Sequence, residues 1–272
     1  GQTFLIIIGI SIGVSVQIFI GSLIQGLQKS LIDKTIGNSS QITISSTKDD
    51  KTIENWEQEI AKVKSTDGRI QKVSPAADSP AFIKYIDKTD PIIIRGLNLT
   101  DGNDLYNIRS KIYKGDIPKN PYEALIGRNL QEELNIKLKD KISLVTSNGN
   151  SKEAVVIGFY DLKVANINKS WVVTSLKTSQ DIFGFKNKIT SIEMQLNSKD
   201  VFKADEIAIK VKAKLSDKNI KVENWKDQNA ELLGGLNGQS VSSLMIQVFV
   251  LISVTLGIAS VLAVTVVQKS KQ

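Results

Sequence analysis

Residues Thr3 to Ile24 read TFLIIIGISIGVSVQIFIGSLI and contain no charged side chain. As an α-helix this stretch would be roughly 33 Å long, which is enough to cross the hydrocarbon core of a bilayer. A second apolar stretch, from Val241 to Val267, reads VSSLMIQVFVLISVTLGIASVLAVTVV. It would be roughly 40 Å long by the same helical rise. The pattern therefore predicts two transmembrane helices, one near each end of the chain.

The charged residues lie almost entirely between these two stretches. Asp, Glu, Lys and Arg are absent from residues 1–28 and 232–268, although they make up 23% of the chain. The intervening segment has an ordinary globular composition and is long enough to bury a core of its own. A cleaved signal peptide is the alternative for the first stretch, but such peptides have a basic start and a shorter apolar core. We therefore expect a folded domain held at a membrane by both of its ends.

The residue types that are missing exclude several kinds of chemistry. The chain has no His and no Cys, so Ser-His-Asp and Cys-His nucleophile systems and ordinary zinc sites are excluded within it. It also lacks a G-x-x-x-x-G-K-[ST] phosphate-binding loop, so any nucleotide hydrolysis would take place on another chain. The net charge of +7 is spread without blocks of like charge, which favours a solvated surface over nucleic-acid binding. We expect no catalytic residue, metal or cofactor in this chain.

Residue periodicity predicts an α+β domain in the middle of the chain. The first helix should continue beyond the membrane as a stalk, so that residues 1–36 form one element ended by Gly37 and Asn38. Strands are expected at 41–46, 70–73, 81–86 and 91–96, and a helix at 56–64 with Asn55 as its N-cap. The character changes from Asn98 to about Phe185, where turn residues alternate with short apolar runs and one helix at 128–134. A strand at 191–196 follows, and then a helix at 201–215, although the alternation of Ile207, Ile209 and Val211 also permits a strand there. The run IKVENW, residues 220–225, leads toward the second apolar stretch.

These elements predict how the chain is organised. A mixed α/β lobe should form from residues 37–97 and 187–228, with a β-rich lobe inserted at 98–186. A stalk and the second membrane helix should occupy 229–272.

Five glycines stand out near the membrane segments. Gly9 and Gly13 form a G-x-x-x-G pattern that allows close helix approach, although glycines are also common in membrane helices generally. Gly234, Gly235 and Gly238 precede the second span, where they would provide either a hinge for the domain or an ordinary loop.

The order of several segments resembles that of a known family. Between the apolar helices run GLQKSLIDKTIGNSSQITISS, PIIIRGLN, IYKGDIP, ALIGRNLQEELNIKLKDKISLVTSNG and VVIGFYD, and the second helix ends in VVQKSKQ. This order resembles the lipoprotein-releasing permeases of the LolC/LolE type, within the wider group of ABC permeases that includes macrolide-exporter and FtsX-type proteins. The most specific piece is GRNLQEELNIKLKDKISLV, residues 127–145, which resembles a helix followed by a strand in the family's periplasmic domain.

The resemblance implies a membrane protein in which two transmembrane α-helices flank an α+β extracytoplasmic domain. It implies a multi-pass permease subunit of the cell inner (plasma) membrane, working with a cytoplasmic ATPase that binds the ATP and with a second permease copy or homologue. The domain would handle a lipoprotein or another envelope substrate. An alternative with the same hydropathy is a receptor or sensor whose two helices flank a ligand-binding domain.

Charge bias leaves the orientation open. Lys269 and Lys271 would place the chain ends in the cytoplasm, but Lys29 and Lys34 flank the other end of the first span equally closely. An extracytoplasmic domain therefore rests on the resemblance.

Overall fold

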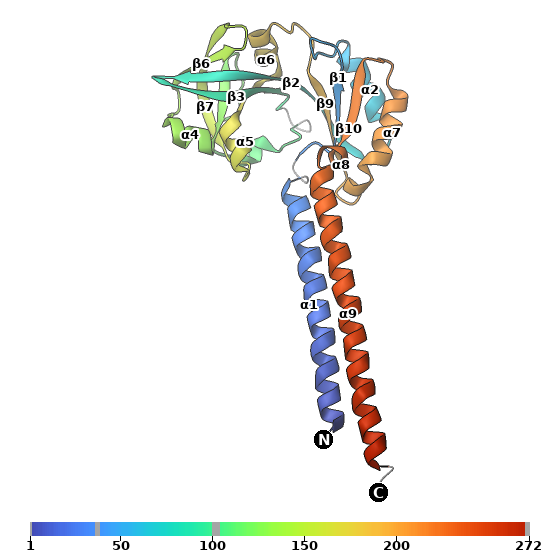
Figure 1. Ribbon diagram of the computed structural model, residues 1–272. Coiled ribbons are helices and arrows are strands. Elements are labelled where there is room, and N and C mark those ends of the chain that lie inside the picture. Colours follow the sequence, from blue (N-terminus) through green and yellow to red (C-terminus); the bar gives the residue numbers. More distant parts are fainter. Residues whose placement is uncertain (1, 36–38, 100–103, 270–272) are drawn as a thin grey trace. The chain divides into compact units, whose positions relative to one another are not determined.

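The computed structural model describes residues 2–35, 39–99 and 104–269 (Figure 1). The chain divides into a helical unit, Gly1–Thr35 with Asn229–Gln272, and a globular unit, Ile36–Gln228.

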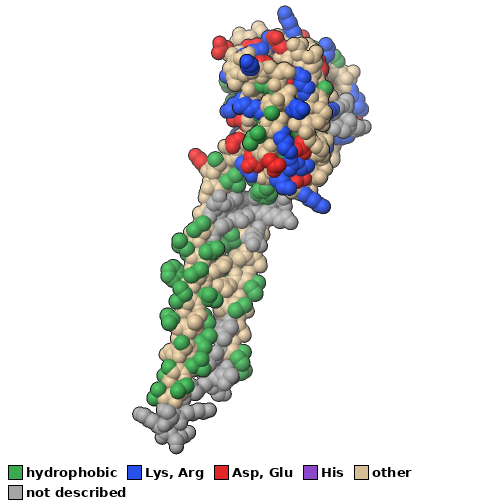
Figure 2. Space-filling model, turned by 90° about the vertical axis from the view of Figure 1, so that its right-hand side faces the viewer, with side chains coloured by type: hydrophobic (Ala, Val, Ile, Leu, Met, Phe, Trp, Pro, Cys, Tyr) green, Lys and Arg blue, Asp and Glu red, His purple; other side chains and the backbone are tan. Residues whose placement is uncertain are grey.

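The helical unit consists of two long helices, α1 (Gln2–Thr35) and α9 (Ala230–Lys269). They are neighbours, since the side-chain Nε2 of Gln17 in α1 donates a 3.0 Å hydrogen bond to the main-chain oxygen of Gln247 in α9. Large apolar side chains of α9 point outward, and Phe249 and Leu256 are 68% and 65% exposed. Figure 2 shows hydrophobic side chains along the helices, whereas Lys, Arg, Asp and Glu cover the globular unit on the same face. An exposed apolar surface of the kind that α9 presents is suited to lipid.

One stretch within the described residues is long and apolar enough to cross a membrane. It is Val241–Val264, with a mean hydropathy of 2.3. In α1 the corresponding stretch, Gly13–Ile24, is shorter. Several side chains of α1 lie outside the described set, so the first span, expected at residues 3–24, stays a prediction. The expected end of its stalk, Ile36 to Asn38, also lies outside the described residues.

The globular unit is built on a ten-stranded sheet with the strand order β10-β1-β9-β2-β3-β8-β5-β7-β4, and β6 pairs with both β2 and β7. Neighbouring strands are antiparallel except for the parallel pairs β3 with β8 and β5 with β7. The strands are β1 (Ile42–Ser46), β2 (Ile70–Tyr85), β3 (Lys88–Leu97), β4 (Ile112–Gly115), β5 (Glu123–Gly127), β6 (Lys141–Thr146), β7 (Ser151–Tyr160), β8 (Trp171–Ser175), β9 (Ser191–Leu196) and β10 (Ile220–Asn224).

Seven short α-helices accompany the sheet. They are α2 (Trp56–Lys64), α3 (Ile108–Lys111), α4 (Arg128–Leu134), α5 (Ala165–Ser170), α6 (Leu176–Phe183), α7 (Ala204–Lys214) and α8 (Trp225–Gln228) among the described residues. In Figure 1, α2 and α7 accompany β1, β9 and β10, whereas α4 and α5 lie beside β3 and β7. The strand β2 links the two groups, because residues 70–76 pair with β9 and residues 76–85 pair with β3. The lobe boundaries expected at 97/98 and 186/187 stay predictions.

Three details of the predicted secondary structure differ from the structure. The strands expected at 70–73 and 81–86 are one continuous strand, β2. The residues between them show no apolar alternation, because the buried positions of this part of the strand carry small side chains. Ala76 and Ala77, for example, are both fully buried. Asn55 does precede α2, but it has a left-handed conformation (φ 50°) and its side chain makes no capping hydrogen bond. The helix expected at 201–215 begins with a 3-10 turn, Val201–Lys203, before α7.

Alternating apolar side chains form the core beneath the sheet. One cluster of buried residues joins β2, β3, β5, β6, β7 and β8 with α4 and includes Ile83, Ile94, Ile126, Leu130 and Leu144. Ile83, Ile94 and Leu144 lie at alternating buried positions of their strands, the pattern of a half-buried strand, whereas Leu130 lies in α4. The predicted bounds of α4 and β9 are confirmed.

Candidate functional site: the helix connections and a buried ionic cluster

The connections from the two long helices enter the globular unit on neighbouring strands. β1 is the first strand after α1, and β10 is the last strand before α9. The two strands are antiparallel, with Ile42 opposite Asn224. The start of β1 and the end of β10 therefore lie at the same end of one strand pair. β10 stands at the edge of the sheet, and β1 is paired on its other side with β9.

Gln41 fastens the connection that precedes β1. Its main-chain N–H donates to the oxygen of Met194 in β9 at 2.8 Å, and its oxygen accepts a 2.9 Å bond from the N–H of Trp225. Its side-chain Oε1 accepts a 2.8 Å bond from the N–H of Leu196. Because Gln41 is only 1% exposed, these bonds are shielded from water. The residue before β1 is thus tied both to β9 and to the residue after β10.

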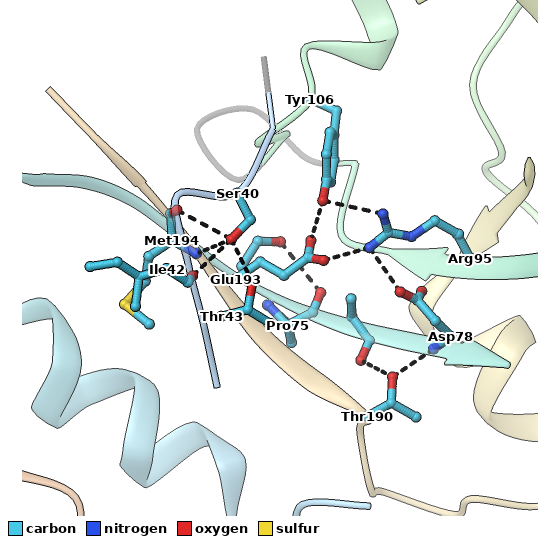
Figure 3. Close-up of polar contacts among 12 residues, drawn as sticks. Ser40, Ile42, Thr43, Pro75, Asp78, Arg95, Tyr106, Thr190, Glu193 and Met194 are labelled. Carbon is cyan, nitrogen blue, oxygen red and sulfur yellow. Dashed lines mark hydrogen bonds and ion pairs between the residues drawn. The ribbon is translucent and has the colours of Figure 1, made fainter. Parts of the chain in front are cut away.

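The neighbouring Ser40 adds to this attachment, as Figure 3 shows. Its Oγ donates to the main-chain oxygen of Ile42 at 2.7 Å and lies 3.0 Å from Oγ1 of Thr43. It also accepts a 3.2 Å bond from the N–H of Met194.

Trp225 fastens the connection that follows β10. The ring is 2% exposed, its Nε1 donates a 2.7 Å bond to the oxygen of Val201, and it meets the ring of Phe202 edge-on at 5.6 Å. A buried indole with a satisfied N–H provides a large, well-oriented anchor. Both connections therefore meet the domain at fixed, buried positions.

A buried ionic cluster links β9 to the rest of the sheet. Glu193 in β9 lies opposite Thr43 of β1 and Ser74 of β2. Its Oε1 accepts a 2.6 Å bond from Nη2 of Arg95, which belongs to β3, the strand beyond β2. Glu193 and Arg95 thus bridge across β2 and join strands that are not direct neighbours (Figure 3).

The side chains of Asp78, Tyr106 and Trp171 surround this ion pair. We call the five residues together the Arg95 cluster: Asp78, Arg95, Tyr106, Trp171 and Glu193. The Arg95 Nη2 lies 2.8 Å from Oδ2 of Asp78, and Nη1 donates a 3.2 Å bond to the Tyr106 hydroxyl. That hydroxyl donates a 2.9 Å bond to Oε2 of Glu193. The guanidinium lies over the ring of Trp171, 4.1 Å from its centroid, and Tyr106 meets Trp171 edge-on at 5.3 Å.

The charges of this cluster are buried and unevenly balanced. Two carboxylates share one guanidinium, and Arg95 and Glu193 are only 4% and 6% exposed. Burial raises the pKa of Asp78 to about 6, the Arg95 guanidinium opposes this rise, and the Glu193 carboxylate adds to it. Burial acts to lower the pKa of Arg95, but the carboxylates of Asp78 and Glu193 outweigh it and raise that pKa well above its ordinary value. Burial likewise raises the pKa of Tyr106.

Not every polar atom of the cluster is satisfied. Within the part of the chain that the structure describes, Asp78 Oδ1 and Arg95 Nε have no hydrogen-bond partner. Unpaired buried polar atoms and shared charges cost stability compared with a well-packed apolar core. The cluster is therefore poorly explained by stability alone, and its directional contacts instead define one relative position of β2, β3 and β9.

Sequence reasoning did not find these residues, although a signal was present. Arg95 lies within the apolar run PIIIRG, and Glu193 lies within SIEMQL. A charged residue in the middle of an apolar strand is rarely fully buried unless it is paired. Two such residues in separate strands indicate a buried ion pair.

Of the predicted glycines, Gly13 is the one that the structure places against the other helix. A Cβ at Gly13 would lie 3.4 Å from Cγ2 of Val254 in α9, which fits the predicted close approach. Gly9 lies within α1, but its surroundings are outside the described residues.

The three glycines predicted as a hinge or a loop have a different setting. Gly234, Gly235 and Gly238 lie inside the continuous helix α9, and a Cβ at each would meet nothing within 4 Å. The loop alternative is therefore wrong, and the hinge stays a prediction.

The chain belongs to the family of the MacB-like periplasmic core domain, which it matches over residues 3–212. Its curated relatives include the lipoprotein-releasing system transmembrane protein LolC. The protein from Xylella fastidiosa is 22% identical over 242 residues, covering 85% of this chain and 57% of the relative. The protein from Buchnera aphidicola is 20% identical over 274 residues, covering 97% and 66%. The resemblance to lipoprotein-releasing permeases is confirmed, and the chain spans less than two thirds of these relatives' length.

A solved structure shows the same fold. The periplasmic region of MacB from Actinobacillus actinomycetemcomitans superimposes with a TM-score of 0.50 at 13% identity, covering 74% of this chain and 96% of that one.

Proposed function

We propose that this chain is part of the transmembrane permease subunit of an ABC-type complex of the cell membrane. In this proposal α1 and α9 both cross the bilayer, and the globular unit lies outside the cytoplasm. The observation that carries the proposal is the family match over residues 3–212. The antiparallel pairing of β1 with β10, the first strand after α1 and the last strand before α9 in the chain, supports it. The charge-free stretches 1–28 and 232–268 support two spans.

ATP would be bound and hydrolysed on a separate cytoplasmic ATPase, and the resulting motion would reach the globular unit through α1 and α9. Because β1 and β10 are antiparallel neighbours, both helices would act on the same edge of the sheet. β9, which is bonded to β1 along four residue pairs, would receive the displacement next. The chain would thus be a transmitter of work rather than an enzyme.

The Arg95 cluster would carry that displacement across the sheet. Apolar contacts are non-directional and tolerate sliding, whereas short charge-assisted hydrogen bonds fix distance and angle. The 2.6 Å contact between Glu193 and Arg95 would therefore make the strands on both sides of β2 move as one body.

The partners follow from the same proposal. A second permease copy or homologue would complete the membrane part of the complex. A lipoprotein or another envelope substrate would be handled by the globular unit, since the relatives are named for lipoprotein release.

The proposal is tested by purifying the full-length protein that contains this chain, through an affinity tag, after coexpression with the ABC ATPase encoded beside its gene. We expect the ATPase to be retained and to hydrolyse ATP in the purified complex. A receptor or sensor with two flanking helices would retain no such ATPase. Failure to retain it, or a kinase or methylation module in the remaining sequence of the full-length protein, would contradict the proposal.

A further inference from the structure

A groove runs across the globular unit between the loop 116–122, helix α6 and the loop 184–187. It consists of two hollows of about 850 Å³ and 500 Å³. The hollows share the lining residues Lys119, Ser175, Lys177, Gln180 and Asn187, so they form one continuous depression. The volume of each hollow lies within the range of about 300–1,000 Å³ that is typical of ligand sites.

The charged residues that line this groove are mostly basic. Lys119, Lys177 and Lys186 line the larger hollow, and Arg109 lines the smaller one. The side-chain ammonium groups of Lys177 and Lys186 form no ion pair or hydrogen bond with any residue that the structure describes. Lys119, by contrast, is paired with Asp116 outside the groove.

One carboxylate, Asp181, belongs to the described lining of the groove. It accepts a hydrogen bond from the Tyr122 hydroxyl, and the Lys152 ammonium lies 3.8 Å from it. Its hydrogen bond and its ion pair are therefore formed with groups other than Lys177 and Lys186. The groove therefore presents uncompensated positive charge to a ligand.

The walls of the groove are held in place before any ligand binds. Ser175 caps α6 by accepting a 3.2 Å bond from the N–H of Thr178. The Thr178 hydroxyl in turn accepts a 3.2 Å bond from the N–H of Tyr122, which fixes the loop 116–122 against α6. On the other side, Trp56 Nε1 donates a 2.9 Å bond to the oxygen of Asn187. A preformed site avoids the cost of ordering its walls on binding.

The remaining lining distinguishes between kinds of anion. Pro121, Tyr122 and Leu176 provide apolar surface along the groove, which an inorganic anion would not use. The amide nitrogen of Gln180 is already bonded to the oxygen of Lys188, and that of Asn187 is bonded to Glu57. Their carbonyl oxygens accept no bond from the described residues, so they are placed to accept N–H groups, which a peptide main chain supplies.

We propose that this groove binds an extended, acidic peptide segment of a partner protein. The ligand's carboxylates would pair with Lys177 and Lys186, its main chain would donate to the amide oxygens, and its apolar side chains would cover Tyr122 and Leu176. The site is separate from the helix connections and from the Arg95 cluster. Its occupation requires no ATP, so it is tested independently of the proposed permease role.

The experiment uses the full chain in a non-ionic detergent and a fluorescein-labelled peptide of ten residues in which Glu alternates with Leu or Ala. Binding is followed by fluorescence anisotropy at low salt. The test variant is Lys177→Glu with Lys186→Glu, and the matched control is Lys84→Glu with Lys218→Glu. Lys84 and Lys218 are exposed, outside the groove and unpaired among the described residues, so both variants change the net charge equally.

We expect saturable binding that the groove variant weakens by about tenfold or more and that the control variant changes by less than about twofold. The milder Lys177→Gln with Lys186→Gln should give an intermediate loss, and equal thermal midpoints would show that the variants are folded. Binding that is absent, or weakened equally by both charge reversals, would overturn the proposal. So would displacement of the peptide by inorganic phosphate, or by phosphatidylglycerol vesicles, at matched charge concentration.

Discussion

Replacing Arg95 with Met tests whether the buried cluster holds the sheet together. The substitution keeps a long, flexible apolar side chain beside Trp171 and Tyr106, but it removes the guanidinium. Asp78 and Glu193 would then be left as two buried carboxylates without a cation. We expect the globular unit to lose much of its stability for this reason.

The contacts of Arg95 set the size of the expected loss in the free energy of unfolding. The guanidinium lies 2.6 Å from Glu193 and 2.8 Å from Asp78, and the side chains of Arg95 and Glu193 are 5% and 8% exposed. Removing one partner of such a buried pair costs about 3–5 kcal/mol. Asp78 can relieve part of this by taking up a proton, because its pKa is already raised to about 6. We therefore expect a loss of about 3 kcal/mol, at the lower end of that range.

The assay is equilibrium unfolding of the full chain in detergent by urea, followed through tryptophan fluorescence. Trp171 lies 4.1 Å from the Arg95 guanidinium, so it reports on the cluster directly. The control is Lys141→Met, which removes an ion pair with Glu153 of the same 2.6 Å length but with 68% and 59% exposed side chains. An exposed pair of this kind is worth about 1 kcal/mol or less.

A second variant separates charge from packing. Combining Arg95→Met with Glu193→Met removes one uncompensated carboxylate, so it should recover at least half of the stability that Arg95→Met loses. If Arg95→Met costs no more than Lys141→Met, or if the double variant is less stable than the single one, the cluster does not act as we argue.

Three further predictions concern other parts of the chain. In the folded state the pKa of Asp78 is raised to about 6 from an ordinary value of 3.8, so between these values the folded state binds a proton that the unfolded chain does not. Protonation of Asp78 should therefore raise the free energy of unfolding by about 1 kcal/mol when the pH falls from 7 to 5. Asp78→Asn should abolish this gain, as measured by urea titrations at both pH values. A Cβ at Gly96 would lie 2.3 Å from Cβ of Ser179 in α6. Gly96→Ala should therefore displace α6 and lower the free energy of unfolding by about 1–3 kcal/mol in the same titrations. An unchanged free energy of unfolding would contradict this close packing. Gly13→Leu should separate α1 from α9, because Val254 already lies 3.4 Å from the position of a Cβ there, and cysteine crosslinking between the helices in vesicles should fall severalfold; unchanged crosslinking would refute it.

Much of the globular unit follows from local sequence. The strand at 191–196 and the helix at 128–134 have the predicted bounds, because their apolar residues recur at the period of a half-buried strand and of a short helix. β2 was predicted as two strands because Ser74 to Pro80 offers only small and polar side chains. Its continuity depends on partners from β9 and β3, which no local pattern reveals.

The candidate site depends on long-range pairing and could not be predicted in the same way. Arg95 and Glu193 are 98 positions apart, and only the strand order brings them together. The meeting of β1 with β10 likewise joins the two ends of the domain. The sequence does place one charge in each of two apolar strands, which indicates a buried pair but leaves its partner open.

Whether ATP-driven motion reaches the globular unit can be measured through spin-label distances in the assembled complex. The chain contains no cysteine, so a single label can be placed at Lys212→Cys on the exposed face of α7 once any cysteines outside these residues are replaced. The distance between labels on the two permease copies is measured in nanodiscs with the ATPase, without nucleotide and with a non-hydrolysable ATP analogue. We expect the distance distribution to shift between these two states. An unchanged distribution in a complex that hydrolyses ATP normally would contradict it.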